Sequence, residues 1–476
     1  MSFTYSRIFL FGPLIISTAL GLTACATVGQ DYRRPDLQEP ASWQAPITET
    51  DRHLRSQSHA DLTNWWATFK DATLDSFLEA TQKDNPTLAK AAAAIDKARA
   101  NRASVDAGFL PQVNASAATG WSGSLKNGAG TSRTANGGLD SSWEIDLFGK
   151  NRRSAESAGA LAQAREADWH DARVSLAAEV AGTYIDYRAC RQKEKYYLDQ
   201  ADSQANTGYL TQLSATAGFT APADARLAEA SAASTRSTAL AQKTECEVLV
   251  KSLVALTGID EPSVRRQLGQ GISSLPQPES LAVSSVPADL VRQRPDIVSA
   301  ERTLASTSAE IGVAEAGRYP SLSLSGSISI SASSASPTTA PWSFGPTLSL
   351  PLFTGGRTEA GIRSARADYD SALADYKQVV RTAVKEVEQS LVRLDSMARR
   401  EQEAGKSAEG YRAYLVATEQ NWRVGGASML DLETARRSTI SADISLLELQ
   451  QSRLQYWIAL YKAMGGGWKE QSGGTK

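Results

Sequence analysis

Long helices with a repeating apolar stripe account for much of the chain. After Arg357, apolar or small side chains recur every three or four residues as far as about Trp422, which predicts one helix of ~65 residues, roughly 100 Å long. A turn follows, and a heptad pattern then runs from Ile440 to Tyr461, with Gln451 as its polar member. Helices this long are typical of coiled coils and helical tubes, because a globular core is too small to bury them.

Strict two-residue alternation predicts four strands. In "PSLSLSGSISISAS" and "WSFGPTLSLPLF", apolar side chains fall on one face, and serine and threonine fall on the other. The predicted strands cover about 111–123, 138–148, 320–333 and 342–353. A soluble sheet with one face on a core would show this alternation too, but strands of about ten residues with a wholly polar second face favour a transmembrane barrel.

A barrel in lipid would need several copies of this chain. Four strands leave two open edges, and unpaired backbone groups are too costly in hydrocarbon to remain there. The polar strand faces would then line a water-filled lumen, and the apolar faces would meet lipid. The predicted lumen-facing residues are Glu144, Ser323, Ser327, Thr347 and Ser349.

The second half of the chain repeats the first. Pro86 lies 209 positions before Pro295, and Gly218 lies 207 positions before Gly425. Each copy predicts a helix, two strands, a long helix, a tight turn and a helix. The predicted domains are a leader over 1–24, a wrapping N-terminal segment over 25–70, the first repeat over 71–258, a Pro/Ser-rich connection over 259–287, the second repeat over 288–465 and a tail over 466–476. Loops at 124–138 and 333–341 are expected to join the paired strands.

The first 26 residues combine a short apolar segment with a cysteine. "IFLFGPLIISTALGL" follows Arg7 and is too short to span a bilayer. The "LTAC" that ends at Cys25 resembles the lipobox of bacterial lipoproteins, which implies a signal peptide over 1–24 and a covalent lipid, N-acyl and S-diacylglycerol, on Cys25. Ala26, in place of aspartate, resembles lipoproteins that pass to the outer membrane. An ordinary secretory signal with an incidental cysteine is the alternative.

The composition argues against several classes of function. The 50 Lys and Arg against 52 Asp and Glu give a net charge of −2, so there is no basic excess to attract nucleic acid. His53, His59 and His170 are scattered, and the sequence contains no HExxH, GxSxG, P-loop or CxxC motif. We therefore expect no catalytic residues, no metal site and no cofactor other than the covalent lipid.

Five segments resemble one known family. They are "NWWATFKDATLDSFLEATQKDNPTL", "RQRPDIVSAERTLASTSAEIGVAEAGRYPSLSL", "PLFTGGR", "VGGASMLDL" and "LYKAMGGGW". Together they resemble outer membrane factors of the TolC superfamily, in particular the NodT-type lipoprotein channels that serve RND efflux pumps. The resemblance covers essentially the whole chain after Cys25.

The resemblance implies an α+β membrane protein and a homotrimer. Each protomer would give four strands to a twelve-stranded barrel in outer-membrane lipid, above a long periplasmic coiled-coil tube. The tube would dock onto a periplasmic adaptor and an inner-membrane RND pump, as a passive efflux duct gated at its periplasmic tip. A lipid-anchored coiled-coil spacer of the cell envelope is the alternative function, but a spacer needs no amphipathic strands, so Ser321–Ala332 favours the duct.

The two remaining cysteines are spaced symmetrically about one glycine. Cys190 lies 28 residues before Gly218, and Cys246 lies 28 residues after it. If Gly218 marks a turn between antiparallel helices, the two cysteines lie at the same height, and the oxidising periplasm would favour a disulfide. Two buried, unpaired thiols are the alternative, because the facing sides must match as well as the height.

Two glycine turns mark the predicted periplasmic tip. Gly218 and Gly425 each fall at a helix–helix turn, and Thr220 and Ser428 are expected to cap the returning helices. In the resembled family this tip meets the adaptor, which implies Gly218, Val424, Gly425 and Ser428 as contacts. The alternative is that the glycines only make the turns.

An acidic residue follows each turn. In the resembled family acidic residues here form a ring that closes the tube, and "SMLDL" matches that pattern at Asp431, with Asp224 as its weaker repeat mate. Three-fold symmetry would bring like charges toward one axis, where they would repel one another and attract cations. The alternative is that Asp431 merely favours the positive end of its helix.

Overall fold

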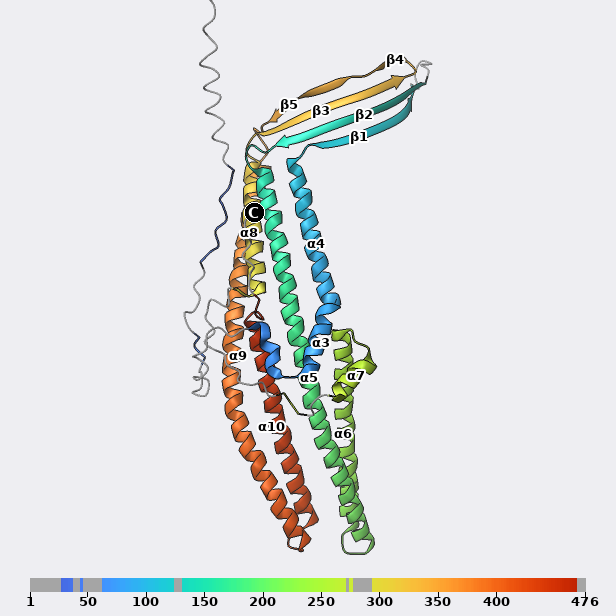
Figure 1. The fold of residues 1–476 in the computed structure, drawn as a ribbon, viewed down its shortest axis with the longest axis vertical. Helices are drawn as coiled ribbons and strands as arrows, with labels where there is room; N and C mark the ends of the chain where they lie inside the picture. Colours follow the sequence, from blue (N-terminus) through green and yellow to red (C-terminus); the bar gives the residue numbers. More distant parts are fainter. Residues whose placement is uncertain are drawn as a thin grey trace, which may run out of the picture. The chain divides into compact units, whose positions relative to one another are not determined.

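The computed structural model describes residues 27–36, 43–45, 62–123, 131–270, 274–276 and 293–468 (Figure 1). The predicted lipidation site, Cys25, lies outside these residues. The chain divides into two compact units. The first comprises Met1–Asp36, Ala94–Glu166 and Ser299–Lys377, and the second comprises Leu37–Ala93, Ala167–Val298 and Gln378–Lys476.

The first unit contains one antiparallel sheet (Figure 1). Its strands are β1 (Gln112–Ser122), β2 (Ser132–Ile145), β3 (Ser321–Ser333), β4 (Ser336–Thr339) and β5 (Trp342–Ser349). β1 pairs with β2, β2 pairs with β3, and β3 pairs with both β4 and β5. The pairing of β2 with β3 joins the two repeats within one sheet.

β4 and β5 form one interrupted line opposite β3. Pro341 separates them because it has no N–H to give to the ladder, although its carbonyl still accepts from the Ser329 N–H at 3.0 Å. The prediction of a loop over 333–341 is therefore wrong at Ser336–Thr339, which is β4. β2 also begins six residues earlier than predicted, at Ser132, and β5 ends at Ser349 rather than 353.

The strand register sorts the side chains into one apolar and one polar face. Leu139 lies opposite Ile328, and Ile328 lies opposite Trp342, so these side chains share a face. On the other face, Glu144 lies opposite Ser323, and Ser323 lies opposite Thr347. The five residues predicted to line a lumen, Glu144, Ser323, Ser327, Thr347 and Ser349, all share this polar face.

Long helices all meet the sheet at one end, where β1 and β3 begin and β2 and β5 end. They are α4 (Pro86–Asp106), α5 (Lys150–Thr216), α8 (Pro295–Ala316) and α9 (Arg357–Arg423), each with residues in both units. α5 and α9 are both 67 residues long. Within the first unit, α5 and α8 approach closely, because small side chains such as Ala158 and Ala305 are buried there and Ser157 Oγ lies 2.9 Å from Ser306 Oγ. η4 (Ala107–Phe109) connects α4 to β1.

The second unit is built around two helical hairpins and an apolar core. α5 is followed by α6 (Pro222–Thr257), and α9 is followed by α10 (Met429–Ala463). η3 (Leu62–Phe69) and α3 (Ala72–Lys83) add Trp65, Leu74 and Phe77 to the core, which α5, α6 and α10 complete with Tyr184, Leu253 and Leu460.

The predicted connection over 259–287 contains a helix. α7 (Glu261–Gln270) buries Val264 and Leu268 in the core of the second unit. The sequence concealed this helix because only these two apolar side chains, one turn apart, mark its buried face. The Pro/Ser-rich connection predicted between the repeats therefore includes a helix of ten residues that its composition did not indicate.

A buried polar network fixes α3 to α5. One carboxylate oxygen of Asp71 accepts hydrogen bonds from the Thr73 and Leu74 N–H groups and so caps α3. The other accepts from the Tyr184 hydroxyl at 2.7 Å and from Arg188 at 3.2 Å. Burial, together with the bond to Asp71, raises the pKa of the Tyr184 hydroxyl, so it stays protonated and remains a donor.

A disulfide joins α5 to α6, as the equal spacing about Gly218 predicts. The Cα atoms of Cys190 and Cys246 are 5.6 Å apart, and the two residues are separated by 56 positions. Both side chains are buried, and Gly218 closes the hairpin between them. The first hairpin is thus cross-linked partway along its length.

Replacing both cysteines by serine should lower the free energy of unfolding by about 2–4 kcal/mol, because the cross-link no longer restricts the unfolded chain. Chemical denaturation of the double variant, beside oxidised and reduced wild-type protein, measures the loss. Reduced wild-type protein should resemble the variant. Recovery of both cysteines in alkylated form from native, unreduced protein would contradict the disulfide.

Candidate functional site

Both helical hairpins of the second unit turn at glycine, and the two turns lie at the same end of that unit (Figure 1). Gly218 has φ +78° and Gly425 has φ +79°. A Cβ at either position would meet no atom within 4 Å, so the backbone conformation, and not packing, requires glycine there. Phe219 and Val424, next to these glycines, are 87% and 81% exposed.

Ser428 and Asp431 cap the start of α10 together. The Ser428 hydroxyl accepts from the Asp431 N–H at 3.1 Å, and the Asp431 carboxylate accepts from the Ser428 N–H at 2.9 Å. Hydrogen bonds from the Ser428 hydroxyl and N–H hold the pKa of the Asp431 carboxyl below its usual range. Because this folded-state pKa is depressed, the capping interaction is complete above the unfolded-state pKa and is lost as the pH falls through the folded-state value.

The first hairpin starts its returning helix differently. Ala221 is the N-cap of α6 and, because alanine has no side-chain acceptor, it makes no side-chain capping bond; Pro222 begins the helix. The expectation that Thr220 caps this helix is wrong, since its hydroxyl instead lies 2.6 Å from Ser214 Oγ across the turn. Asp224 lies in the first turn of α6 and is exposed.

Glu433 is a buried carboxylate that the sequence reasoning missed. It lies two residues past Asp431 but is only 4% exposed, and it bonds to side chains of α5. Its carboxylate accepts from Thr207 Oγ1 at 2.6 Å and Gln204 Nε2 at 2.7 Å, and Arg436 donates to it from the next helical turn at 2.7 Å. The only sequence signal is a glutamate between the buried Leu432 and Ala435, with an arginine three residues later.

Polar contacts between α5 and α10 continue away from the tip, beside the apolar core that both helices share. Lys193 Nζ lies 2.9 Å from Glu448. Further along, Asp186 Oδ1 accepts from Gln451 Nε2 at 2.6 Å and from Gln455 Nε2 at 2.7 Å. We call this line of contacts, from Glu433 to Gln455, the polar seam. Polar contacts can be exchanged for water at a small net cost, about 0.5–1.5 kcal/mol for each hydrogen bond, so such a seam can open more readily than an apolar core.

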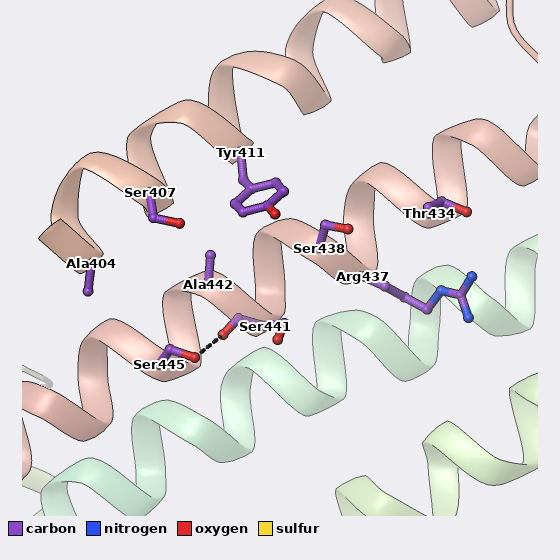
Figure 2. Close-up of a pocket in the computed structure, with 9 residues that line it drawn as sticks. All are labelled: Ala404, Ser407, Tyr411, Thr434, Arg437, Ser438, Ser441, Ala442 and Ser445. Atoms are coloured by element: carbon purple, nitrogen blue, oxygen red, sulfur yellow. Dashed lines mark hydrogen bonds between the residues drawn. The ribbon is translucent and has the colours of Figure 1, made fainter.

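A hollow of about 550 Å³ lies between α9 and α10. Figure 2 shows small hydroxyl side chains along it, with Tyr411 and Arg437 as its larger members. Ser407, Ser438, Ser441 and Ser445 line it, and Ser445 Oγ donates to the Ser441 carbonyl at 2.8 Å. Side chains this short leave the helix backbones accessible to another helix.

The described part of the chain offers little for other chemistry. In these ranges no three or more His, Cys, Asp or Glu side chains come together in a way that could hold a metal ion. Nor does any described helix combine the length and hydrophobicity needed to cross a bilayer.

The two halves of the chain match one family model, described as outer membrane efflux protein, over residues 77–259 and 286–466. This chain belongs to that family. The double match agrees with the internal repeat. The predicted resemblance is confirmed, and with it the α+β fold built from two repeats.

Curated relatives cover nearly the whole chain. Nodulation protein T of Rhizobium leguminosarum bv. trifolii is 30% identical over 457 residues, which is 94% of this chain and 96% of that protein. The cation efflux system protein CusC of Escherichia coli is 27% identical, over 95% of this chain and 98% of that protein. Outer membrane protein OprJ of Pseudomonas aeruginosa is 28% identical, over 97% and 96%.

Solved structures agree with the fold. The outer-membrane channel OprN is 32% identical and superposes with a TM-score of 0.79, covering 93% of this chain and 99% of that one. The Campylobacter jejuni CmeC outer membrane channel has a TM-score of 0.84 at 21% identity, which supports the fold alone, over 94% of this chain and 96% of that one. The chain is an outer-membrane efflux channel that extends into the periplasm.

Replacing Glu433 by alanine should lower the free energy of unfolding by about 1–3 kcal/mol, because the buried amide of Gln204 and the guanidinium of Arg436 lose this acceptor. Denaturation of the purified channel measures this change. Glu419→Ala is the matched control, since Glu419 makes only an exposed pair with Arg423 within the described residues, and it should stay close to wild type. Equal stability of the two variants would show that the Glu433 contacts do not hold the hairpins together.

Proposed function

We propose that this channel is the passive outer-membrane duct of a tripartite RND-type export system. Three copies of the chain would share one barrel, and a periplasmic adaptor would connect them to an inner-membrane pump. The observation that carries the proposal is the sheet, which has a sorted apolar and polar face and two free edges. Several relatives carry matching names, among them the pyoverdine export outer membrane protein OpmQ of Pseudomonas aeruginosa.

The free edges favour a closed ring of copies. Among the described residues, β1 pairs only with β2, and β5 pairs only with β3. Hydrocarbon offers no water to satisfy these backbone groups, so each edge needs a strand from a neighbouring copy. Four strand positions in each of three copies would make twelve around the ring, counting β4 and β5 as one line.

The two faces of the sheet would then meet different solvents. The polar face, with Glu144, Ser323, Ser327, Thr347 and Ser349, would line the lumen. The apolar face, which carries Leu139, Ile328 and Trp342, would meet lipid. A structural spacer, the alternative function, gives no reason for this sorting.

A covalent lipid on Cys25 would add a second membrane attachment. Its support is the lipobox-like "LTAC" and the similarity to the probable outer membrane lipoprotein SilC of Salmonella typhimurium, 25% identical over 96% of this chain and 99% of that protein. Acyl chains contribute ~0.8 kcal/mol for each CH₂ group that enters the membrane.

The gate of the duct would lie at the hairpin turns. Asp431 is fully exposed, and its depressed pKa keeps it ionised at neutral pH. Three such carboxylates near one axis would repel one another and attract cations, with Asp224 adding a second set of charges. Opening would separate the two hairpins of each copy, and Glu433 in the polar seam would resist that movement.

The adaptor would bind at the same end of the second unit. Gly218, Val424, Gly425 and Ser428 form the two turns, and Val424 with Phe219 exposes large apolar surface there. Large apolar side chains gathered in solvent are typical of interaction sites. The serine-lined hollow between α9 and α10 could accept a helix of the adaptor beside the tip (Figure 2).

Recording in planar bilayers tests the duct and its gate together. Wild-type protein should conduct, with preference for cations and block by divalent ions. Asp431→Ala should raise the conductance and weaken both properties, because the ring of charge is removed, while Glu419→Ala should leave them unchanged. No conductance from any variant would favour a spacer. Altered thermal stability with unchanged conductance and selectivity would make Asp431 a helix cap only.

Lysine substitutions on the two strand faces test the sheet. Ile328→Lys should destabilise the inserted protein by about 2–4 kcal/mol near the bilayer midplane, because the charge would meet lipid. Ser327→Lys, the next residue on the polar face, should be tolerated. Folding into lipid vesicles measured against urea gives both values. Equal effects at the two positions would contradict a lipid-facing Ile328.

A further inference from the structure

One buried arginine makes most of the side-chain hydrogen bonds that hold residues 27–31 against the first unit, and the exposed Arg152 adds one to Thr27 Oγ1 at 3.1 Å. Arg153, in the first turn of α5, is only 3% exposed. Its Nε donates to the Val28 carbonyl at 3.0 Å, and one terminal nitrogen donates to the Gly29 carbonyl at 3.0 Å and to the Asp31 carboxylate at 2.9 Å. The Val28 N–H in turn donates to the Phe148 carbonyl at 3.0 Å. We call residues 27–31 the strap.

Glycines make room for the strap. Gly29 has φ +87°, and a Cβ on it would lie 2.8 Å from the Cα of Gly312 in α8. A Cβ on Gly149 would lie only 2.3 Å from Thr27 Cγ2. A side chain at Gly29, Gly149 or Gly312 would displace the strap. The binding site of the strap is therefore specific in shape as well as in hydrogen bonding.

Most hydrogen bonds of the Arg153 guanidinium go to the strap. A buried charge needs partners, and two carboxylates supply them, Asp31 from the strap and Glu156 from the next helical turn at 2.7 Å. Three of its four hydrogen bonds to the described residues go to strap atoms, and two of those accept through the backbone. The planar guanidinium of arginine can donate to several acceptors in fixed directions, so it suits this site better than the ammonium group of a lysine would.

The strap is seated where the strands become helices. Phe148 and Gly149 lie between the end of β2 and the start of α5, and Gly312 lies in the last two turns of α8, shortly before β3. Cys25 precedes Thr27 by two residues, so chain geometry places it within about 7 Å of Thr27. A lipid on Cys25 would therefore be tethered close to the end of the sheet.

We propose that Arg153 is a positioning residue for the lipid anchor, which it fixes at the strand–helix junction so that the acyl chains enter the membrane beside the sheet. The inference rests on the proposed lipidation of Cys25. Its consequence is kinetic as well as structural. Once the acyl chains are in the membrane, a short fixed tether presents the strands to the same bilayer at high effective concentration, whereas a loose N-terminal segment would not.

A double-mutant cycle separates positioning from mere stabilisation. Full-length protein is made as wild type, Cys25→Ser, Arg153→Met and the combined variant, and the fraction inserted in the outer membrane as assembled channel is measured. Loss of the clamp should reduce insertion about as far as loss of the lipid, and the combined variant should be no worse than either, because both changes break one connection. Additive losses would overturn the proposal, since Arg153 would then act independently of the lipid.

Hydrogen exchange follows the strap directly. In acylated Arg153→Met protein, the amides of residues 27–36 should exchange faster by about tenfold or more, as expected when charge-assisted hydrogen bonds are lost. Arg99→Met is the matched control and should resemble wild type, since within the described residues Arg99 pairs only with the exposed Glu166 in the same unit. Unchanged exchange in the Arg153 variant would overturn the clamp.

Two further measurements keep the outcome clear. If Arg153→Met does not fold, Gly29→Ala displaces the strap while it leaves the helices unchanged, and it should reproduce both effects. Wild-type insertion and exchange in that variant would refute the proposal. Mass spectrometry of the N-terminal peptide reports acylation separately. An unmodified Cys25 would refute the proposed lipidation, and with it the role of Arg153 in placing a lipid, but not the contact between Arg153 and the strap.

Discussion

The unpaired backbone edges of β1 and β5 are the constraint from which the rest of the structure follows. An antiparallel sheet that enters lipid must satisfy every N–H and C=O group within protein, because hydrocarbon replaces none of them. The chain provides four strand positions, two from each repeat, and the pairing of β2 with β3 joins the repeats. Duplication of one helix–strand–strand–helix unit therefore gives a sheet whose two outer edges are still unpaired. Association of copies would pair them.

The second unit must hold its long helices together and still allow the two hairpins to separate. Its core is apolar around Phe77 and Leu253, and the first hairpin is closed by a disulfide. α5 and α10, which belong to different hairpins, both contribute to that core, but they also meet along the polar seam, where Glu433 and Asp186 accept hydrogen bonds from the facing helix. A cross-linked first hairpin, together with exchangeable polar contacts between the hairpins toward the turns, suits a tube that opens at one end.

Local periodicity predicted most of the fold, because strands and long helices repeat their signal many times. The cysteine pairing was predictable for the same reason, since equal spacing from Gly218 fixes height in an antiparallel hairpin. The pattern failed where it was short or interrupted. Pro341 concealed β4, two apolar residues were too few to mark α7, and Pro222 moved the helix cap from Thr220 to Ala221.

The buried charges were beyond reach of the sequence. Arg153 and Glu433 lie in polar or alanine-rich stretches that resemble solvent-exposed helix faces. Their burial depends on partners far along the chain, the strap for Arg153 and α5 for Glu433, and no local pattern records those contacts. Asp431 and Asp224, by contrast, were proposed as gate residues from the family resemblance and from their positions after the turns, and the pairing of Asp431 with Ser428 became visible only in the structure.

The number of chains in the inserted channel tests this account most directly. Native mass spectrometry of protein extracted from the outer membrane in detergent counts the copies without any assumption about register. The free edges of β1 and β5 predict more than one chain per particle, and the family resemblance predicts three, retained until the strands unfold. A stable, membrane-inserted particle of one chain would contradict the account, because two strand edges would then remain unpaired in lipid.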